Sequence, residues 1–406
     1  MKSSFSKLYN KSRETVGYMI REITHICRNL PKRAPGTHGE KEAADYLAGK
    51  LKDDCGCSEV KTETFTVRPA AFYGYFYITA GLGVLTAALF FVTPVLSIII
   101  GAIDLLLFVL QFGLYKELID PIFPKKTSVN VTGIRKCSGE CKRRIFICGH
   151  IDAPWEFTLN YHFGGIVFET PGAASVCGVM FYMAISIVAL TGAAWTRTAA
   201  LIGLIFIPFF ILVGFTYNTK VVSDGANDNL SGCMMGVSLL KEMEEHGIDT
   251  ENTEIGVILT GCEEAGLKGA AAWSRKHQGD FDDVPTYILC FDTIHDPQYL
   301  MANAKDLNGL LKTDQQLCKA FLEAAEDAGV PCKKGWVPPF GGSTDCTAFL
   351  RGGFRAISVT GLNHALEDYY HTRKDSYDNM NPEGMENCYR ALVRFIELAD
   401  NNKLGI

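Results

Sequence analysis

The chain has 406 residues, of which 48% are hydrophobic and 21% charged, and its formal net charge is −6. This length allows one large domain or two ordinary ones, and the composition excludes a disordered chain and a strongly basic nucleic-acid binder. The 14 cysteines form no dense framework of the kind seen in short secreted domains. We therefore expect reduced thiols in a cytosolic setting, and the polar start of the chain predicts no cleavable signal peptide.

Two long apolar blocks interrupt the chain. Residues 69–103 contain no charged residue, and residues 171–219 contain one, Arg197. Each block has room for two helices of about 20 residues, the length that a bilayer core requires. Four buried helices of a large soluble protein are the alternative interpretation. We predict transmembrane spans near 71–92, 95–115, 173–194 and 198–218.

The flanks of these blocks predict the orientation of the protein in the membrane. Each block holds an even number of spans, so all polar segments lie on one side. Positive charges gather on that side, whereas the turn of the second hairpin has Arg197 alone. By the positive-inside rule we predict a multi-pass membrane protein whose polar part faces the cytoplasm. The positive flanking residues are Arg68, Lys116, Lys125, Lys126 and Lys220.

Asp104 lies inside a predicted span. An acid within a membrane segment is a candidate functional group. A polar contact between packed helices, or a span shifted toward the interface, is the alternative.

The remaining segments, residues 1–70, 116–170 and 220–406, are predicted to form one α/β domain, with 71–115 and 171–219 as inserted hairpins. Strands alternating with helices predict a mainly parallel or mixed sheet flanked by helices. Between two strands, Ser138-Gly139 predicts a surface hairpin with Cys137 and Cys141 as free thiols. Helices are expected over 8–30, 40–51, 232–245, 267–276, 312–329 and 382–401. Strands are expected over 59–67, 128–134, 144–148, 254–259, 286–291 and 356–359.

Chemically versatile residues follow these strands or lie in loops. In α/β folds such positions meet at the carboxyl edge of the sheet. Alone, each motif has an ordinary explanation, such as helix capping for Asp228 or a solvated loop for His371. Together, two histidines and several carboxylates predict a pair of divalent ions, with zinc favoured and manganese or cobalt as alternatives. The candidates are His150 with Asp152, Asp228, the pair Glu263 and Glu264, Asp292, and His371.

The order of these motifs resembles the dizinc aminopeptidases of peptidase family M28. The early loop beginning Arg33-Ala-Pro-Gly-Thr-His-Gly, and the loop Ser343-Thr-Asp, are also similar to segments of that family. The resemblance implies that His150 and Asp292 bind one zinc ion, that Glu264 and His371 bind the other, and that Asp228 bridges them. It implies Glu263 as general base, Asp152 as the group that orients His150, and Tyr370 as a candidate substrate contact.

The resemblance therefore predicts a metallo-aminopeptidase that hydrolyses N-terminal residues of peptides with a water activated by two metals. The second hairpin separates Asp152 from Asp228, so we expect the site to face the membrane, with a loop at 153–172 between site and lipid. That placement favours a hydrophobic or membrane-associated peptide substrate; simple anchoring is the alternative. The alternative hypotheses for the function are a lipid amidase or deacylase, a glutaminyl-cyclase-like enzyme, an aminoacylase-type relative, and a scaffold without activity.

Overall fold

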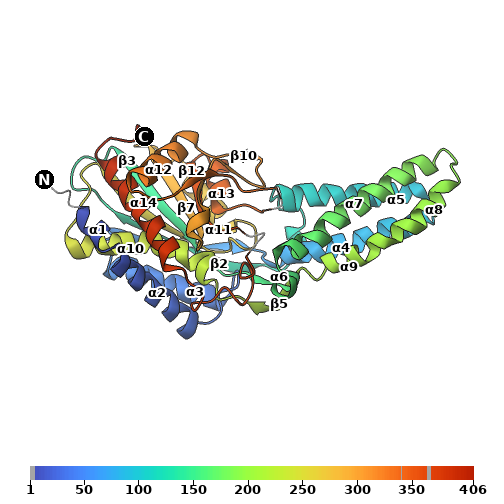
Figure 1. Ribbon diagram of the computed structural model, residues 1–406, viewed down its shortest axis with the longest axis horizontal. Helices are drawn as coiled ribbons and strands as arrows, with labels where there is room; N and C mark the ends of the chain where they lie inside the picture. Colours follow the sequence, from blue (N-terminus) through green and yellow to red (C-terminus); the bar gives the residue numbers. More distant parts are fainter. Residues whose placement is uncertain (1–4, 340, 364–366) are drawn as a thin grey trace.

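The computed structural model describes residues 5–339, 341–363 and 367–406. An eight-stranded sheet lies at the centre of a domain from which a bundle of long helices projects (Figure 1). The strand order is β1-β2-β6-β3-β7-β12-β8-β11. These strands are β1 Glu59–Val67, β2 Lys126–Arg135, β3 Arg143–His150, β6 Thr253–Thr260, β7 Thr286–Ile294, β8 Leu300–Asn303, β11 Lys333–Gly335 and β12 Arg355–Gly361. Two short pairs lie outside the sheet: β4 Trp155–Phe157 with β5 Tyr217–Val222, and β9 Lys305–Asp306 with β10 Leu311–Lys312.

The sheet is mixed, as predicted. The central strands β6, β3, β7 and β12 run parallel, whereas β1, β2 and β8 join by antiparallel pairing. The expected hairpin between β2 and β3 is wrong, because β6 lies between them. Their connection crosses the start of β6, where Ser138 donates its backbone N–H to Thr250 and Gly139 donates to Glu251.

Helices cover both faces of the sheet. The alternation of side chains along β3 divides the core, because Ile145 and Ile147 pack in one cluster and Phe146 and Cys148 in the other. The first face is covered by α2 Ser12–Asn29, α3 His38–Asp53, α10 Ser231–His246, α12 Gln315–Asp327 and α14 Pro382–Asp400, with the short α1 Ser6–Asn10 beside them. The second face is covered by α11 Lys268–Lys276 and α13 Asp345–Arg351.

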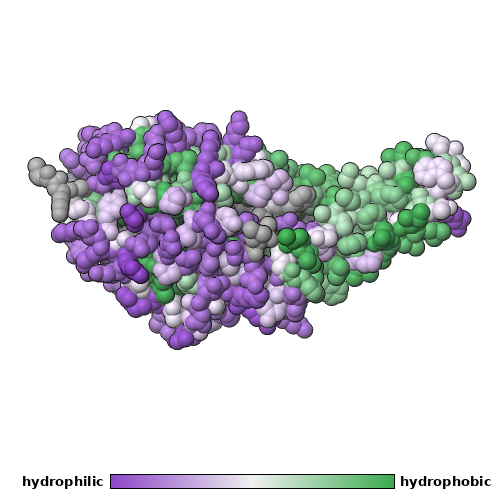
Figure 2. Space-filling model, viewed as in Figure 1, coloured by the Kyte–Doolittle hydropathy of each residue, from purple (hydrophilic) through white to green (hydrophobic). Residues whose placement is uncertain are grey.

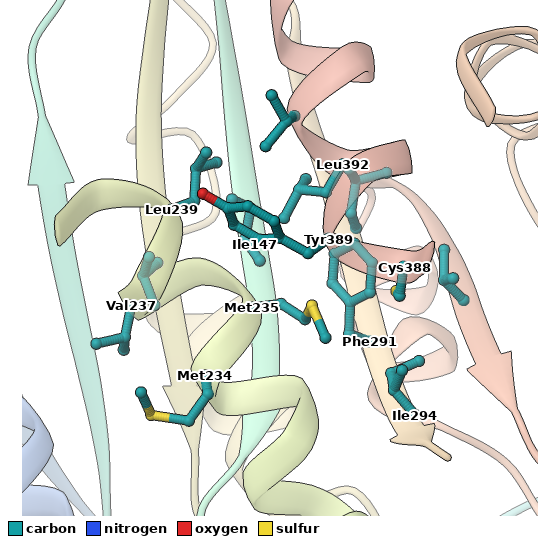
Figure 3. Close-up of a cluster of buried hydrophobic side chains, with 14 of the residues drawn as sticks. Ile147, Met234, Met235, Val237, Leu239, Phe291, Ile294, Cys388, Tyr389 and Leu392 are labelled. Carbon is teal, nitrogen blue, oxygen red and sulfur yellow. The ribbon is translucent and has the colours of Figure 1, made fainter. Parts of the chain in front are cut away.

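The larger core fixes the helix that follows the candidate ligand Asp228. Met235 and Leu239 of α10 pack with Tyr389 and Leu392 of α14, over the strand residue Ile147 (Figure 3). Burial of a side chain of this size contributes about 1.5–3 kcal/mol. The start of α10 is therefore held firmly against the sheet edge.

Four helices long and apolar enough to cross a membrane form the projecting bundle. They are α4 Ala70–Phe90, α5 Pro94–Leu107 continued by a π-helix to Gly113, α7 Gly165–Ala189, and a broken helix Trp195–Val213 made of α8 Trp195–Ile202, a 3-10 turn and α9 Ile207–Val213. Gly83 and Gly178 leave room for the ring of Phe210, which a Cβ at either position would meet at under 3.0 Å. The outside of the bundle is apolar (Figure 2). Arg197 lies in the first turn of α8, just after the turn that follows α7.

The third and fourth spans differ from their predicted bounds. Helix α7 begins at Gly165, earlier than the predicted start of the third span near 173, and it contains Pro171. The expected loop at 153–172 is therefore not a loop: it forms β4, the short α6 Thr158–Phe163 and the start of α7. The fourth helix ends at Val213 because the chain then enters β5, where Tyr217 pairs with Phe157 of β4. The apolar composition continues through both segments, so it did not reveal the strand.

A polar contact fixes the end of the bundle to the domain. Asp120 accepts hydrogen bonds from Gln111 at the end of the second span (3.0 Å) and from Lys268 at the start of α11 (2.7 Å). Gln111 in turn accepts from the backbone N–H of Leu118 at 2.9 Å. The bundle is thus attached by buried charge-assisted bonds, which are stronger than neutral ones.

Candidate metal centre

The predicted site residues come together at one edge of the sheet. His150 is the last residue of β3, Glu263 and Glu264 follow β6, and Asp292 lies near the end of β7. His371 follows β12. These four strands are parallel neighbours, so their carboxyl ends meet at the same edge, and Asp228 reaches them from the loop before α10.

Asp228 lies between the two histidines. Its two carboxylate oxygens are 3.2 Å from Nε2 of His150 and 3.1 Å from Nε2 of His371. Nε2 of His150 is 3.8 Å from Glu263, and Nε2 of His371 is 3.3 Å from Glu264. Potential ligand atoms of His150, Glu263 and Asp292 lie within 4.8 Å of one another, as do those of His150, Asp228 and Glu264.

Burial dominates the electrostatics of these groups. It raises the pKa of Glu263 and of Glu264 well above the ordinary range, and it raises the pKa of Asp292 to about 7. Burial also disfavours ionised Asp228, but hydrogen bonds with His150 and His371 outweigh this effect and lower its pKa. For His150, burial disfavours the charged ring, and the surrounding carboxylates, Glu263 foremost, more than offset it and raise its pKa. These residues compete for protons that a divalent cation would displace.

The donor set fits divalent metal ions. Within the described part of the chain, the carboxylates of Asp228, Glu263 and Glu264 pair with histidines and with no lysine or arginine. Oε1 of Glu264 is buried without a hydrogen-bond partner among the described residues. Clustered buried acids are costly unless a cation compensates them. Imidazole and carboxylate together are the ligands that zinc accepts.

Asp375, which is not among the predicted ligands, holds the Asp228 loop in place. It accepts the backbone N–H of Asn227 at 2.8 Å and that of Asp228 at 3.1 Å. Burial, followed by the charge of Asp228, raises the pKa of Asp375 to about 7. In the sequence, the only indication of this role is that Asp375 follows the predicted ligand His371 by four residues, in the segment His371-Thr-Arg-Lys-Asp375. On the other side of the loop, Asn229 donates to the carbonyl of Phe291 at 2.8 Å.

Asp152 acts on the site in two ways. Its carboxylate accepts the backbone N–H groups of Glu263 and Glu264, each at 3.0 Å. Nδ1 of His150 is 3.1 Å from the backbone carbonyl of Asp152 and 3.6 Å from its carboxylate. Asp152 therefore fixes the Glu-Glu turn directly and contacts the ring mainly through its backbone.

The early loop supports the same turn. Glu40 is fully buried and accepts the backbone N–H of Cys262 at 2.8 Å and that of Gly36 at 3.1 Å. Arg33 donates to the carbonyls of Ile151 at 2.8 Å and Gly225 at 3.0 Å. Sequence reasoning noted this segment as similar to the family but assigned no role to either residue, because neither belongs to a ligand motif.

The segment between the site and the bundle contacts His371. Phe157 of β4 donates its backbone N–H to the carbonyl of His371 at 2.7 Å, and the two rings lie 4.4 Å apart. Asn160 of α6 donates to the carbonyl of Tyr370 at 2.6 Å. The position of the second histidine thus depends on residues that lead directly into α7.

One cavity of about 240 Å³ joins the metal centre to the inside of the bundle. At the centre it is lined by Asp228, Glu263, Glu264, Asp292, Tyr370 and His371. At the rim stand Tyr115 and Tyr217, whose pKa values burial raises. Inside the bundle it is lined by residues of all four spans, among them Tyr75, Ala80, Asp104, Phe108, Val179 and Val213.

Comparison with known proteins agrees with this geometry. The model of peptidase family M28 matches residues 211–396. The zinc aminopeptidase BSAP from Bacillus subtilis superposes with a TM-score of 0.56 at 13% identity, covering 95% of this chain and 94% of that one. The aminopeptidase from Aneurinibacillus sp. strain AM-1 gives 0.55 at 12% identity, covering 97% and 96%.

A glutaminyl cyclase from Bacteroides thetaiotaomicron bound to N-acetylhistamine also superposes, with a TM-score of 0.53 at 13% identity and coverage of 96% and 97%. No curated protein sequence matches the chain. At these identities the solved structures establish the fold, and the predicted zinc-aminopeptidase fold is confirmed, with four membrane-length helices added. The family model adds that residues 211–396, somewhat less than half of the chain, are similar to peptidase family M28.

Proposed function

We propose that the protein is a membrane-anchored zinc aminopeptidase that removes N-terminal residues from peptides. The observation that carries this proposal is the buried cluster in which Asp228 lies between His150 and His371, with Glu263 and Glu264 beside them. The family match and the aminopeptidase neighbours support a zinc hydrolase.

In this proposal His150 and Asp292 would hold one zinc ion, Glu264 and His371 would hold a second, and Asp228 would serve both sites. Bound zinc would polarise the scissile carbonyl and lower the pKa of the attacking water. Glu263 takes a proton from that water and passes it to the leaving amine, a role that suits a buried carboxyl with a raised pKa.

The proposed metal centre favours a substrate with a free α-amine. Asp228, Glu264 and Asp292 line the cavity at the point where the scissile bond would lie. With metals bound these carboxylates would serve as ligands, and a neutral free α-amine could still bind a metal ion through its nitrogen lone pair, whereas the nitrogen of an acylated N-terminus offers no such lone pair. This preference separates an aminopeptidase from an amidase built on the same hydrolytic centre.

We further propose that the four apolar helices span the bilayer and that the domain faces the cytoplasm. The positive residues Arg68, Lys116 and Lys220 lie at the domain end of the bundle, and Arg197 lies at its tip. In intact cells, a charged maleimide should label an Arg197→Cys variant from outside. The native thiols Cys137 and Cys141 on the domain should react after lysis alone; the reverse pattern would contradict this orientation.

Purified protein in lipid nanodiscs tests the activity. One peptide is offered with a free N-terminus, with an acetylated N-terminus, and with an N-terminal glutamine. We expect release of single residues from free peptides, loss of activity with a chelator, and recovery with zinc. Cleavage of the acetylated peptide would indicate an amidase or endopeptidase, and conversion of the glutamine peptide to pyroglutamate would indicate a cyclase.

A further inference from the structure

The cavity continues from the metal centre into the helical bundle, far beyond what one ordinary side chain needs. Asp104 lines its inner part and lies nine residues before Gly113, where the second span ends. At a rise of 1.5 Å per residue this places Asp104 about 14 Å along the helix from its domain end. On α4, Ala80 lines the cavity at a comparable depth, ten residues after the helix begins at Ala70.

The walls of this inner part are suited to hydrocarbon. Aromatic side chains lead inward from the rim, and small aliphatic side chains follow; they include Phe72, Phe76, Phe112, Ala80, Val176 and Val179. Among the described residues, the polar groups that line the cavity along the helices belong to Tyr75, Thr79, Asp104 and Ser175, with Glu169 in the second turn of α7. Asp104 is 94% buried, since its exposed fraction is 6%.

An extended peptide would fit this space poorly. Each of its residues brings a backbone N–H and a C=O that need partners away from water, and unsatisfied groups cost several kcal/mol each in a hydrocarbon environment. The few polar side chains of the inner cavity cannot pair with successive peptide groups. A hydrocarbon chain makes no such demand and gains close contact with the walls.

We propose that the substrates are peptides whose N-terminal residue carries a long hydrocarbon chain, and that this chain occupies the cavity inside the bundle. The inference rests on the proposed aminopeptidase function. An aminopeptidase binds the first residue of the peptide in the closed end of its site, and here that end is the cavity inside the bundle. The cleaved peptide then leaves toward the solvent. The length of about 14 Å between Gly113 and Asp104 corresponds to about ten carbons of an extended chain, and the carboxyl group of Asp104 disfavours chains that pass beyond it.

A series of peptides that differ in the first residue tests the length preference. Alanine, norleucine, 2-aminodecanoic acid and 2-aminohexadecanoic acid precede one constant sequence, and kcat/KM is measured in nanodiscs. We expect kcat/KM to rise at least about tenfold from alanine to 2-aminodecanoic acid, less than the full transfer gain for the added methylenes, and to rise no further with the longest chain.

A matched pair of variants on one helix locates the effect. Ala80→Phe fills the cavity, whereas Leu85→Phe adds the same ring at a residue that is 42% exposed on the outside of α4. The ratio of kcat/KM between the 2-aminodecanoyl and alanyl peptides should fall to about one in Ala80→Phe and stay unchanged in Leu85→Phe. If alanyl peptides are cleaved but the ratio is near one in the unmodified protein, this inference fails and the aminopeptidase proposal stands.

Binding is tested without turnover in the Glu263→Gln protein. A free-amine peptide whose first residue ends in a diazirine-bearing alkyl chain is photolysed, and the labelled residues are mapped by mass spectrometry. Labels on α4, α5 or α7 facing the cavity would show that the hydrocarbon chain occupies the bundle. If the unmodified protein then cleaves none of the peptides, the proposed function fails although this binding site stands. Labels confined to the domain surface overturn it. Equal competition by a plain long-chain alcohol would mean that the cavity takes lipid tails only, which also overturns it.

Discussion

The domain and the bundle handle buried polar groups in opposite ways. At the sheet edge, Asp152, Asp375 and Glu40 each accept two or more hydrogen bonds that fix the neighbouring loops. In the bundle, Asp104 faces a cavity with largely apolar walls, and its carboxyl group has no hydrogen-bond partner among the described residues. The sheet edge of the domain thus holds its polar groups in fixed positions, whereas the bundle encloses a largely apolar cavity.

Under the proposals made above, the two regions would act on different parts of one substrate. Changes in the domain should alter metal content and kcat for every peptide, whereas changes inside the bundle should alter the choice among peptides. The following predictions test the domain side of this division, from the largest expected effect to the smallest.

Glu263→Gln should abolish proton transfer and leave the metals in place. We expect kcat to fall by about 10³-fold, within the range typical of a lost general base. Metal analysis by mass spectrometry should still find two ions per chain, because Glu263 is not assigned as a ligand. A variant that lost a metal together with activity would make Glu263 a ligand instead.

His371→Ala should remove one of the two metals. His295→Ala is the matched control, since His295 lies nearby but its ring pairs with Asp296 at 2.9 Å. We expect about one ion per chain in His371→Ala and two in His295→Ala. Two ions in both variants would contradict the assignment of His371.

Asp375→Asn should weaken metal binding without removing a ligand. The amide can accept one of the two backbone N–H groups that Asp375 now accepts, so the Asp228 loop loosens. Loss of such a supporting group typically costs 10–100-fold in metal affinity, about 1.4–2.7 kcal/mol. Competition with a chelator measures the metal affinity, and excess zinc should restore most of kcat. As a control, the substitution Asp378→Asn at an exposed residue should leave the metal affinity unchanged.

Glu40→Gln should change how stability depends on pH. Burial, with the charge of Asp152 second, raises the pKa of Glu40 from 4.5 to about 8. Between these values the folded protein holds a proton that the unfolded chain releases. The free energy of unfolding of the unmodified protein therefore falls with rising pH, by up to about 1.4 kcal/mol per pH unit.

The glutamine variant lacks this slope. Its Tm should lie below that of the unmodified protein at pH 5, since glutamine satisfies one fewer backbone N–H, and the difference should shrink toward pH 8. Thermal melts in nanodiscs at the two pH values measure it. A Tm difference that stays constant or grows with pH would show that Glu40 is ionised in the folded state.

The sequence predicted the strands of the centre well, because buried parallel strands are continuous apolar runs that end in a polar residue. His150 and Asp292 lie where the strand-end rule expects them. The edge strand β1 also matches its predicted bounds, but because its residues alternate and not because it is a buried apolar run. The same reasoning gave a wrong hairpin between β2 and β3, because the insertion of β6 between them is a long-range pairing that no local signal reports.

Other features depend on contacts that a single sequence does not reveal. Strands β4 and β5 lie at the edges of apolar segments, so they were merged with the predicted loop and the fourth span. Glu40 and Asp375 resemble ordinary surface acids in sequence, and their burial follows from the backbone N–H groups that meet them in the fold. Asp104 was noted as unusual, but its place on the cavity wall required the packing of four helices.

The metal centre itself is tested most directly by an anomalous difference map at the zinc absorption edge from crystals of the protein grown with zinc. The account predicts two peaks about 3.5–4 Å apart. One should lie beside His150 and Asp292, the other beside Glu264 and His371, and Asp228 should touch both. A single peak would contradict the two-metal mechanism and favour a cyclase-like centre, and the absence of any peak at these residues would contradict the enzyme assignment.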